Sequence, residues 1–130
     1  MTIANICIIA AAMLPVLTAG IGKSPAFGKP RREGGYDNTA PRAWADKLTG
    51  WQARAMAAQN NGFEALPLFI AGVLVAQQNH AAQDRVDELA IAFIAIRLVY
   101  TALYVGNKPS LRSIVWGIGV VCCMAMFFIS

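Results

Sequence analysis

RAMAAQNNGFEALPLFIAGVLVAQ, residues 54–77, is the stretch that decides how this chain folds. Its length suits a membrane-spanning helix, but its first half carries Asn60, Asn61 and Glu64. An ionisable side chain at bilayer depth costs about 2.5–3.5 kcal/mol and usually faces a bundle interior or a cavity. A helix advances about 100° per residue, so one face of this helix collects Arg54, Ala57, Asn61, Glu64 and Leu68. Other helices must therefore cover that polar stripe.

The composition excludes several classes of protein. The chain has 130 residues, of which 57% are hydrophobic and only 14% charged, which is too apolar for an ordinary soluble domain. The net charge of +4 comes from a basic cluster between two apolar runs, without interleaved aromatic residues, so nucleic-acid binding is not indicated. Cys7, Cys122 and Cys123 form no CxxC motif and lie in apolar runs, which predicts buried free thiols. With His80 as the single histidine, no metal site is expected.

Four apolar stretches predict an all-α integral membrane protein built as a four-helix bundle. The expected helices cover about residues 3–22, 53–78, 85–106 and 110–129, with a loop at 23–52 that includes a helical turn at Arg42–Leu48. The loop is expected in the cytoplasm, and its simplest role is that of a solvated linker that enforces topology. A cleavable signal peptide needs basic residues before its apolar run, whereas here they follow it, so residues 3–22 are expected to be a true first helix.

The basic residues also predict an orientation. Nine of the eleven Lys and Arg residues lie in or beside the connections after the first and third apolar stretches. Cytoplasmic loops carry an excess of such residues, so both termini are expected outside the cytoplasm.

Glu64 and Arg97 are predicted to form a buried ion pair. Each lies eight or nine residues inside its antiparallel helix, at a depth of roughly 12–14 Å. Matching depth and opposite charge make this pair the simplest way to bury both groups. Its role could be to lock the bundle or to serve a site.

A polar cleft is expected above that pair. Arg97, Tyr100 and Tyr104 share a helix face, and Arg112 and Ser113 begin the next helix. The expected cleft has cations at its mouth, amides and a phenol midway and the ion pair at its base, which suits an anionic, peptide-like small molecule. In that order its residues are Arg54, Tyr104 and Arg112, then Asn60, Asn61 and Tyr100, then Glu64 and Arg97.

These residues resemble the bacterial branch of the MAPEG family, the membrane-associated proteins in eicosanoid and glutathione metabolism. The resemblance covers roughly residues 36–116. It is carried by Tyr36-Asp37-Asn38, Pro41-Arg42, the run LTGWQARA at 48–55, Asn61-Gly62-Phe63-Glu64 with Pro67 and Phe69, Arg97-x-x-Tyr100-x-x-x-Tyr104, and Arg112-Ser113.

The resemblance implies a homotrimer of the bacterial inner membrane that binds glutathione as co-substrate between protomers on the cytoplasmic side. The matching glutathione contacts are Asn61, Glu64, Tyr104 and Arg112, with Arg112 stabilising the thiolate and Ser113 and Tyr104 assisting. The implied activity is a glutathione-dependent transferase or peroxidase that acts on lipophilic electrophiles.

Two other functions stay open. One is a catalytically silent protein of the same fold that binds a lipid or another thiol, since the eicosanoid members carry an arginine where this chain has Ala57. The other is a small multidrug transporter, which also has four spans and a buried glutamate. Such transporters carry that glutamate in the first span, which here holds no carboxylate.

Overall fold

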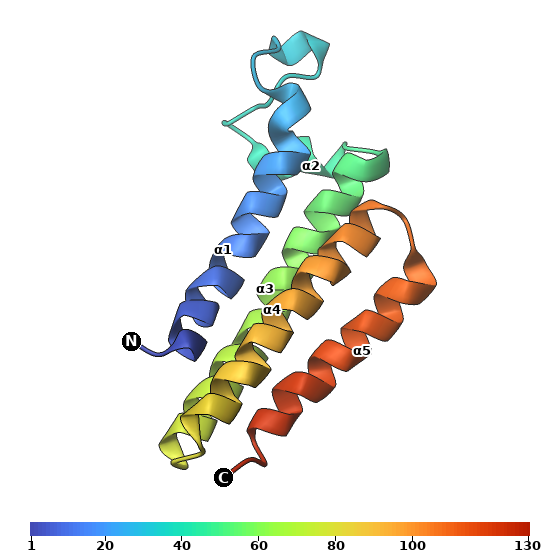
Figure 1. Ribbon diagram of the computed structural model, residues 1–130. Coiled ribbons are helices and arrows are strands. Elements are labelled where there is room, and N and C mark those ends of the chain that lie inside the picture. Colours follow the sequence, from blue (N-terminus) through green and yellow to red (C-terminus); the bar gives the residue numbers. More distant parts are fainter.

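The structure, a computed structural model of residues 1–130, confirms that the chain is all-helical (Figure 1). Its four long helices are α1 (Ile3–Lys23), α3 (Gly50–Gln78), α4 (Gln83–Val105) and α5 (Pro109–Met126). The segment between α1 and α3 contains two 3₁₀ turns, η1 (Ser24–Ala26) and η2 (Arg31–Glu33), and the short helix α2 (Pro41–Asp46). The helix α3 begins at Gly50, earlier than the residue 53 expected from its apolar pattern.

The long helices run in alternating directions along a common axis (Figure 1). Both termini and the turn between α3 and α4 lie at one end, while residues 24–49 and the turn between α4 and α5 lie at the other. The helix α1 packs on α3 and α4, and α5 packs on α4 and α3. The connections of α3 to α4 and of α4 to α5 are short, which is typical of antiparallel neighbours.

Local sequence signals set several helix ends. The Thr2 side chain accepts a hydrogen bond from the Asn5 backbone N–H at 3.1 Å and caps α1. Pro109 occupies the first turn of α5, where its missing N–H costs nothing. Just past the ends of α3 and α4, His80 and Asn107 adopt left-handed backbone angles, with φ of 58° and 59°, and reverse the chain.

Small residues let α1 approach α3 closely. A Cβ atom added to Gly62 would lie 2.7 Å from Cγ of Pro15, and one added to Gly22 would lie 3.0 Å from Cβ of Ala55. Close approach through small residues is the usual way in which membrane helices gain packing energy. Because α1 covers this face of α3, the polar stripe of α3 is left to face α4 and α5.

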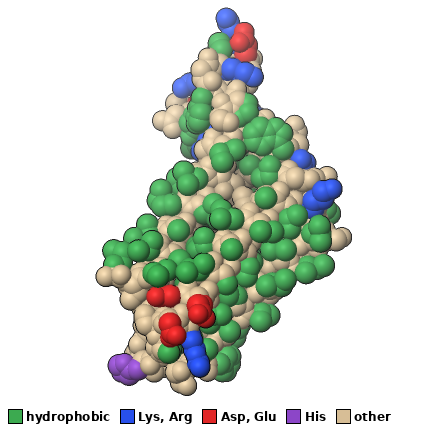
Figure 2. Space-filling model, in the orientation of Figure 1, with side chains coloured by type: hydrophobic (Ala, Val, Ile, Leu, Met, Phe, Trp, Pro, Cys, Tyr) green, Lys and Arg blue, Asp and Glu red, His purple; other side chains and the backbone are tan.

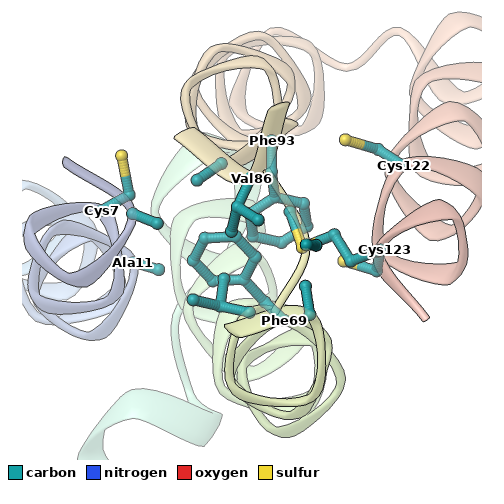
Figure 3. Close-up of a cluster of buried hydrophobic side chains, with 13 residues drawn as sticks. Cys7, Ala11, Phe69, Val86, Phe93, Cys122 and Cys123 are labelled. Atoms are coloured by element: carbon teal, nitrogen blue, oxygen red, sulfur yellow. The ribbon is translucent and has the colours of Figure 1, made fainter. Parts of the chain in front are cut away.

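An apolar core holds the helices together in the half of the molecule that contains the two termini (Figure 3). Phe69 of α3 stacks on Phe93 of α4 with ring centroids 4.2 Å apart. Cys123 of α5 is buried beside them, as is Cys7 of α1. The three cysteines are free and buried, as expected, and the Cys122 thiol donates to the Leu89 carbonyl at 3.2 Å.

Many large apolar side chains are exposed and only 25 of 130 residues are buried, so the isolated chain needs an apolar surrounding (Figure 2). Three helical stretches are long and apolar enough to cross a membrane: Ile3–Ala26, Gln83–Val105 and Pro109–Met126. The helix α3, which carries Asn60, Asn61 and Glu64, is not among them.

A hydrogen-bonded network ties the start of α1 to the turn between α3 and α4. The Asp87 carboxylate accepts from the Ala4 backbone N–H and from the Gln83 amide, both at 2.8 Å. The Gln77 amide donates to the Thr2 hydroxyl at 3.2 Å and to Asn5 Oδ1 at 3.1 Å. A carboxylate at a helix N-terminus also interacts favourably with the helix dipole.

Residues 24–49 contain α2, close to the helical turn expected at Arg42–Leu48, and make packing contacts of their own. The ring of Tyr36 meets Phe27 and Trp44 edge-on, with centroids 5.9 and 5.1 Å away, and Lys23 lies 5.0 Å above the same ring. The Thr39 hydroxyl and backbone N–H both donate to Asp37, which holds the pKa of that carboxyl below its usual range. Arg31, 3.5 Å from Asp37, acts in the same direction.

Gly62→Ala should destabilise the protein by about 1–3 kcal/mol, since the new methyl group would collide with the rigid Pro15 ring. Gly117→Ala is the matched control, because no atom lies within 4 Å of a Cβ atom at that helical glycine. Alanine favours helix over glycine by up to about 1 kcal/mol, so the control should be neutral or stabilising. Thermal unfolding in detergent compares the two, and equal melting temperatures would contradict the close contact.

Candidate functional site

A polar cleft of about 410 Å³ opens between α3 and α5, with α4 contributing its third wall. Seven of the nine residues predicted to form a site line it. The cleft is lined by Asn60, Asn61 and Glu64 of α3, Tyr100 and Tyr104 of α4, and Arg112 and Ser113 of α5, together with Ala57 and Trp116. The other two predicted residues, Arg54 and Arg97, lie outside the cleft.

Arginines and tyrosines alternate along the α4 and α5 side of the site. The Arg97 guanidinium lies 4.2 Å from the ring centroid of Tyr100, and the Arg112 guanidinium lies 4.3 Å from that of Tyr104. The two tyrosine rings meet edge-on at 5.8 Å. A cation over an aromatic face is held electrostatically without losing its hydrogen-bond donors. Arg112 is thereby positioned, with its N–H groups left for a bound anion.

The α3 side of the cleft provides hydrogen-bond acceptors, whereas the α5 side provides a cation. Glu64 is exposed in the isolated chain and can accept hydrogen bonds from a cationic group. The Oδ1 atom of Asn61 is buried and has no hydrogen-bond partner in the chain. A buried unpaired acceptor is costly, so a ligand N–H group would be favoured there. The cleft thus offers a carboxylate and an amide opposite a cation.

Below the cleft lies an apolar chamber of about 300 Å³. It shares Asn61, Glu64 and Trp116 with the cleft. Arg97 belongs to this chamber, whose remaining lining is Ala65, Leu68, Phe93, Ile96, Val115, Gly119, Val120 and Cys123.

The predicted ion pair between Glu64 and Arg97 is wrong. Both residues line the chamber, but the one ion pair of the structure joins Arg31 to Asp37, and Glu64 and Arg97 lie beyond the 4.0 Å limit of an ion pair. The Arg97 guanidinium instead packs over Tyr100, one turn along its own helix. Equal depth along two helices does not make two side chains point at each other.

Arg54 was predicted to lie at the mouth of the cleft, but it does not line the cleft. Its side chain instead contacts the end of α4. Its Nε donates to the Val105 carbonyl at 3.0 Å. Val105 is the last residue of α4, so this carbonyl lacks an intrahelical partner. Arg54 therefore caps α4 and holds the end of that helix against α3.

A third depression, the basic groove, has a volume of about 570 Å³ and lies where α2 meets α1 and α3. It carries Lys23, Arg42 and Asp46, and it shares Asn60 with the polar cleft. Two cations therefore lie in a depression that borders the cleft.

Trp116 is the lining residue that the sequence analysis missed. It follows Arg112 by four residues and so lies on the same face of α5. That four-residue spacing is the signal in the sequence that places Trp116 beside Arg112.

Comparison with protein families identifies the group to which this arrangement belongs. The family model of the MAPEG family matches residues 3–130, essentially the whole chain. The chain belongs to the MAPEG family. No curated protein and no solved structure matches it. Membership of MAPEG, together with three helices able to cross a bilayer, makes the chain an integral membrane protein.

Arg54→Met should lower stability by about 1.5–3 kcal/mol, the usual value of a hydrogen bond to a charged group. The methionine keeps most of the apolar stem, so the loss reports the contact with Val105. Arg32→Met is the control, because Arg32 is exposed. Unfolding in detergent measures both variants. If Arg54→Met melted at the normal temperature but bound ligand poorly, Arg54 would belong to the binding site and would not cap α4.

Proposed function

We propose that this MAPEG protein is a glutathione-dependent transferase or peroxidase that acts on lipophilic electrophiles. The observation that carries the proposal is the polar cleft, where Arg112 faces the Asn61 amide and the Glu64 carboxylate across about 410 Å³. Glutathione carries a thiol, two peptide groups, an amine and two carboxylates, so it can satisfy each of these groups. Membership of the family supports the same choice.

In this proposal Glu64 pairs with the amine of glutathione, and Asn61 Oδ1 accepts from a peptide N–H group. The second contact is supported by the absence of any partner for that buried oxygen in the chain. The two carboxylates are left for cations, and the cleft itself holds only Arg112. Lys23 and Arg42 in the bordering basic groove supply that charge.

Arg112 is assigned to the sulfur. The nucleophile is the thiolate, and a guanidinium beside it stabilises the anion more in a partly dry site than in water. The thiolate then attacks the electrophilic carbon of the second substrate, forming an S–C bond while the leaving group departs with the electron pair. Tyr104 holds Arg112 in place through its ring, and Ser113 adds a hydroxyl donor beside it.

The alternative is a catalytically silent MAPEG protein that binds a lipid or another thiol. Ala57 favours it, since an arginine stands at this position in the eicosanoid members and the cleft keeps a single cation. Binding of glutathione without conjugation to a generic aryl halide would distinguish the silent protein from the enzyme.

The proposal includes α3 as a fourth membrane span in a homotrimer with its basic end in the cytoplasm. Asn60, Phe63 and Glu64 are exposed on α3 in the isolated chain, and polar groups at bilayer depth do not face lipid. Neighbouring protomers would cover them. The number three comes from the family resemblance, and the orientation comes from the basic residues at one end.

Arg112→Ala should raise the pKa of bound glutathione and lower turnover at least about a hundredfold, the usual effect of losing one preorganised donor. Arg112→Lys keeps the charge but loses the planar fork and should fall between Arg112→Ala and the unchanged protein. Ultraviolet absorbance of the thiolate, followed against pH, measures the first effect. Tyr104→Phe is the control, since its ring still supports Arg112. If the thiolate of bound glutathione titrated normally in Arg112→Ala but not in Tyr104→Phe, Tyr104 would be the residue that stabilises the thiolate.

Light scattering with correction for detergent should give three times the protomer mass of 13.9 kDa. A monomer that still binds glutathione would refute the assembly.

A further inference from the structure

The segment at residues 24–49 begins and ends at the same level, beside the end of a membrane span. The first apolar span covers Ile3–Ala26. The start of α3 lies level with the end of that span, because the Gln52 amide donates to the Gly22 carbonyl at 3.0 Å. Phe27, the first residue after the span, is 56% exposed, and exposed aromatic side chains are typical of the membrane–water interface. The segment is therefore held at the level of the lipid headgroups.

This segment carries more positive than negative charge. It holds five Lys and Arg residues against three Asp and Glu residues, and Figure 2 shows Lys and Arg side chains on the upper, protruding part of the molecule. The one ion pair of the chain joins Arg31 to Asp37, so the other basic side chains of the segment have no carboxylate partner. Basic residues directly beside a membrane helix attract anionic lipid headgroups.

Two of these cations line one depression, the loop depression, with a volume of about 340 Å³. Arg31 and Lys47 lie in its wall together with Asp37. The Asp37 carboxylate is 3.5 Å from Nε of Arg31, so the two terminal N–H₂ groups of this arginine remain available to an anion. The rest of the lining is Gly34, Gly35, Ala40, Ala43, Trp44 and Leu48. Two cations and one carboxylate leave the depression with an excess of one positive charge.

Trp44 gives the loop depression an amphipathic wall. Its ring is held edge-on by Tyr36, with centroids 5.1 Å apart, and it lines the depression. An indole combines an apolar body with one N–H donor, which suits the boundary between a phosphate or ester oxygen and hydrocarbon.

The loop depression is separate from the site assigned to glutathione. Arg42 and Asp46 of α2 line the basic groove, whereas Ala43 and Trp44 of the same helix line the loop depression. The loop depression shares no residue with the basic groove or with the polar cleft. A ligand in it therefore does not depend on the proposed function.

We propose that the loop depression binds the headgroup of an anionic phospholipid, with the phosphate between Arg31 and Lys47 and the glycerol ester region against Trp44. The excess of positive charge favours an anionic headgroup over a zwitterionic one. Charge-assisted hydrogen bonds from a guanidinium and an ammonium suit a phosphate. The level of the depression, beside the end of α1, favours a lipid over a soluble phosphate.

Trp44 provides the measurement when Trp51→Phe and Trp116→Phe leave it as the one tryptophan of the chain. Phosphatidylglycerol brominated near the glycerol should quench its fluorescence saturably in detergent micelles. Phosphatidylcholine with the same brominated chains should need at least about a tenfold higher mole fraction. Equal quenching by the two lipids would overturn the assignment. Glycerol phosphate in solution should not compete, and competition as strong as that of unbrominated phosphatidylglycerol would show a soluble phosphate ligand and refute the lipid.

Two pairs of basic residues in the segment give matched variants. Arg31→Gln with Lys47→Gln should reduce the preference for phosphatidylglycerol to less than about twofold. Lys29→Gln with Arg32→Gln removes the same charge from exposed residues that do not line the depression, and it should keep most of the preference. Equal losses in the two pairs would show diffuse attraction by the whole segment and would refute a built site, as would a full preference in both.

A single variant covers the case in which loss of the pair between Arg31 and Asp37 disturbs the segment. Lys47 is exposed and has no ion-pair partner, so Lys47→Gln should fold normally and still lower the preference severalfold. An unchanged preference in this variant would contradict the assigned position of the phosphate. Glutathione binding by calorimetry in the same samples separates the two proposals. Selective quenching without glutathione binding would refute the proposed function and support the headgroup site, whereas the reverse would refute the headgroup site alone.

Discussion

The close contact between α1 and α3 is the constraint on which the rest of the molecule depends. Pro15 occupies the space that a side chain at Gly62 would need, so the two helices touch at the level where α3 carries its polar residues. The face of α3 that meets α1 is thereby reserved for small residues such as Ala55 and Ala58. Asn61 and Glu64 are turned toward α4 and α5, which places the cleft and the chamber there. A larger residue at position 62 would disturb both the packing and the site.

The two depressions between α3 and α5 differ in chemistry because their walls differ in depth along the helices. Toward the basic end the walls are amide, carboxylate, phenol and guanidinium, while farther in they are aliphatic and aromatic. Arg97 marks the border, buried on one side and stacked on Tyr100 on the other. Such a gradient suits a protein that brings a water-soluble and a membrane-soluble molecule together. The phenyl and alkyl walls exclude water, which strengthens the charge interactions at the border.

The sequence analysis was most successful where helical periodicity decides position. The spacing of Asn61, Glu64, Tyr104 and Arg112 predicted that they share one cleft, and the structure brings them together. The sequence analysis failed where a contact depends on the direction in which a side chain points. Depth placed Glu64 and Arg97 at one level, but rotation about the helix axis and the nearby Tyr100 ring turned Arg97 elsewhere. The contacts of Tyr36 with Phe27 and Trp44 were not predicted, because they follow no regular period.

The two sides of the cleft have different folding requirements, because a short turn joins α4 to α5 whereas α3 is distant from α5 in the sequence. Tyr104 and Arg112 are eight residues apart and belong to one helical hairpin, so the cationic and aromatic half forms through local contacts with a small cost of loop closure. The half that carries Asn61 and Glu64 comes from α3, far away in the chain. Substitutions in α3 can therefore change which molecule is recognised while the hairpin keeps its cation in place.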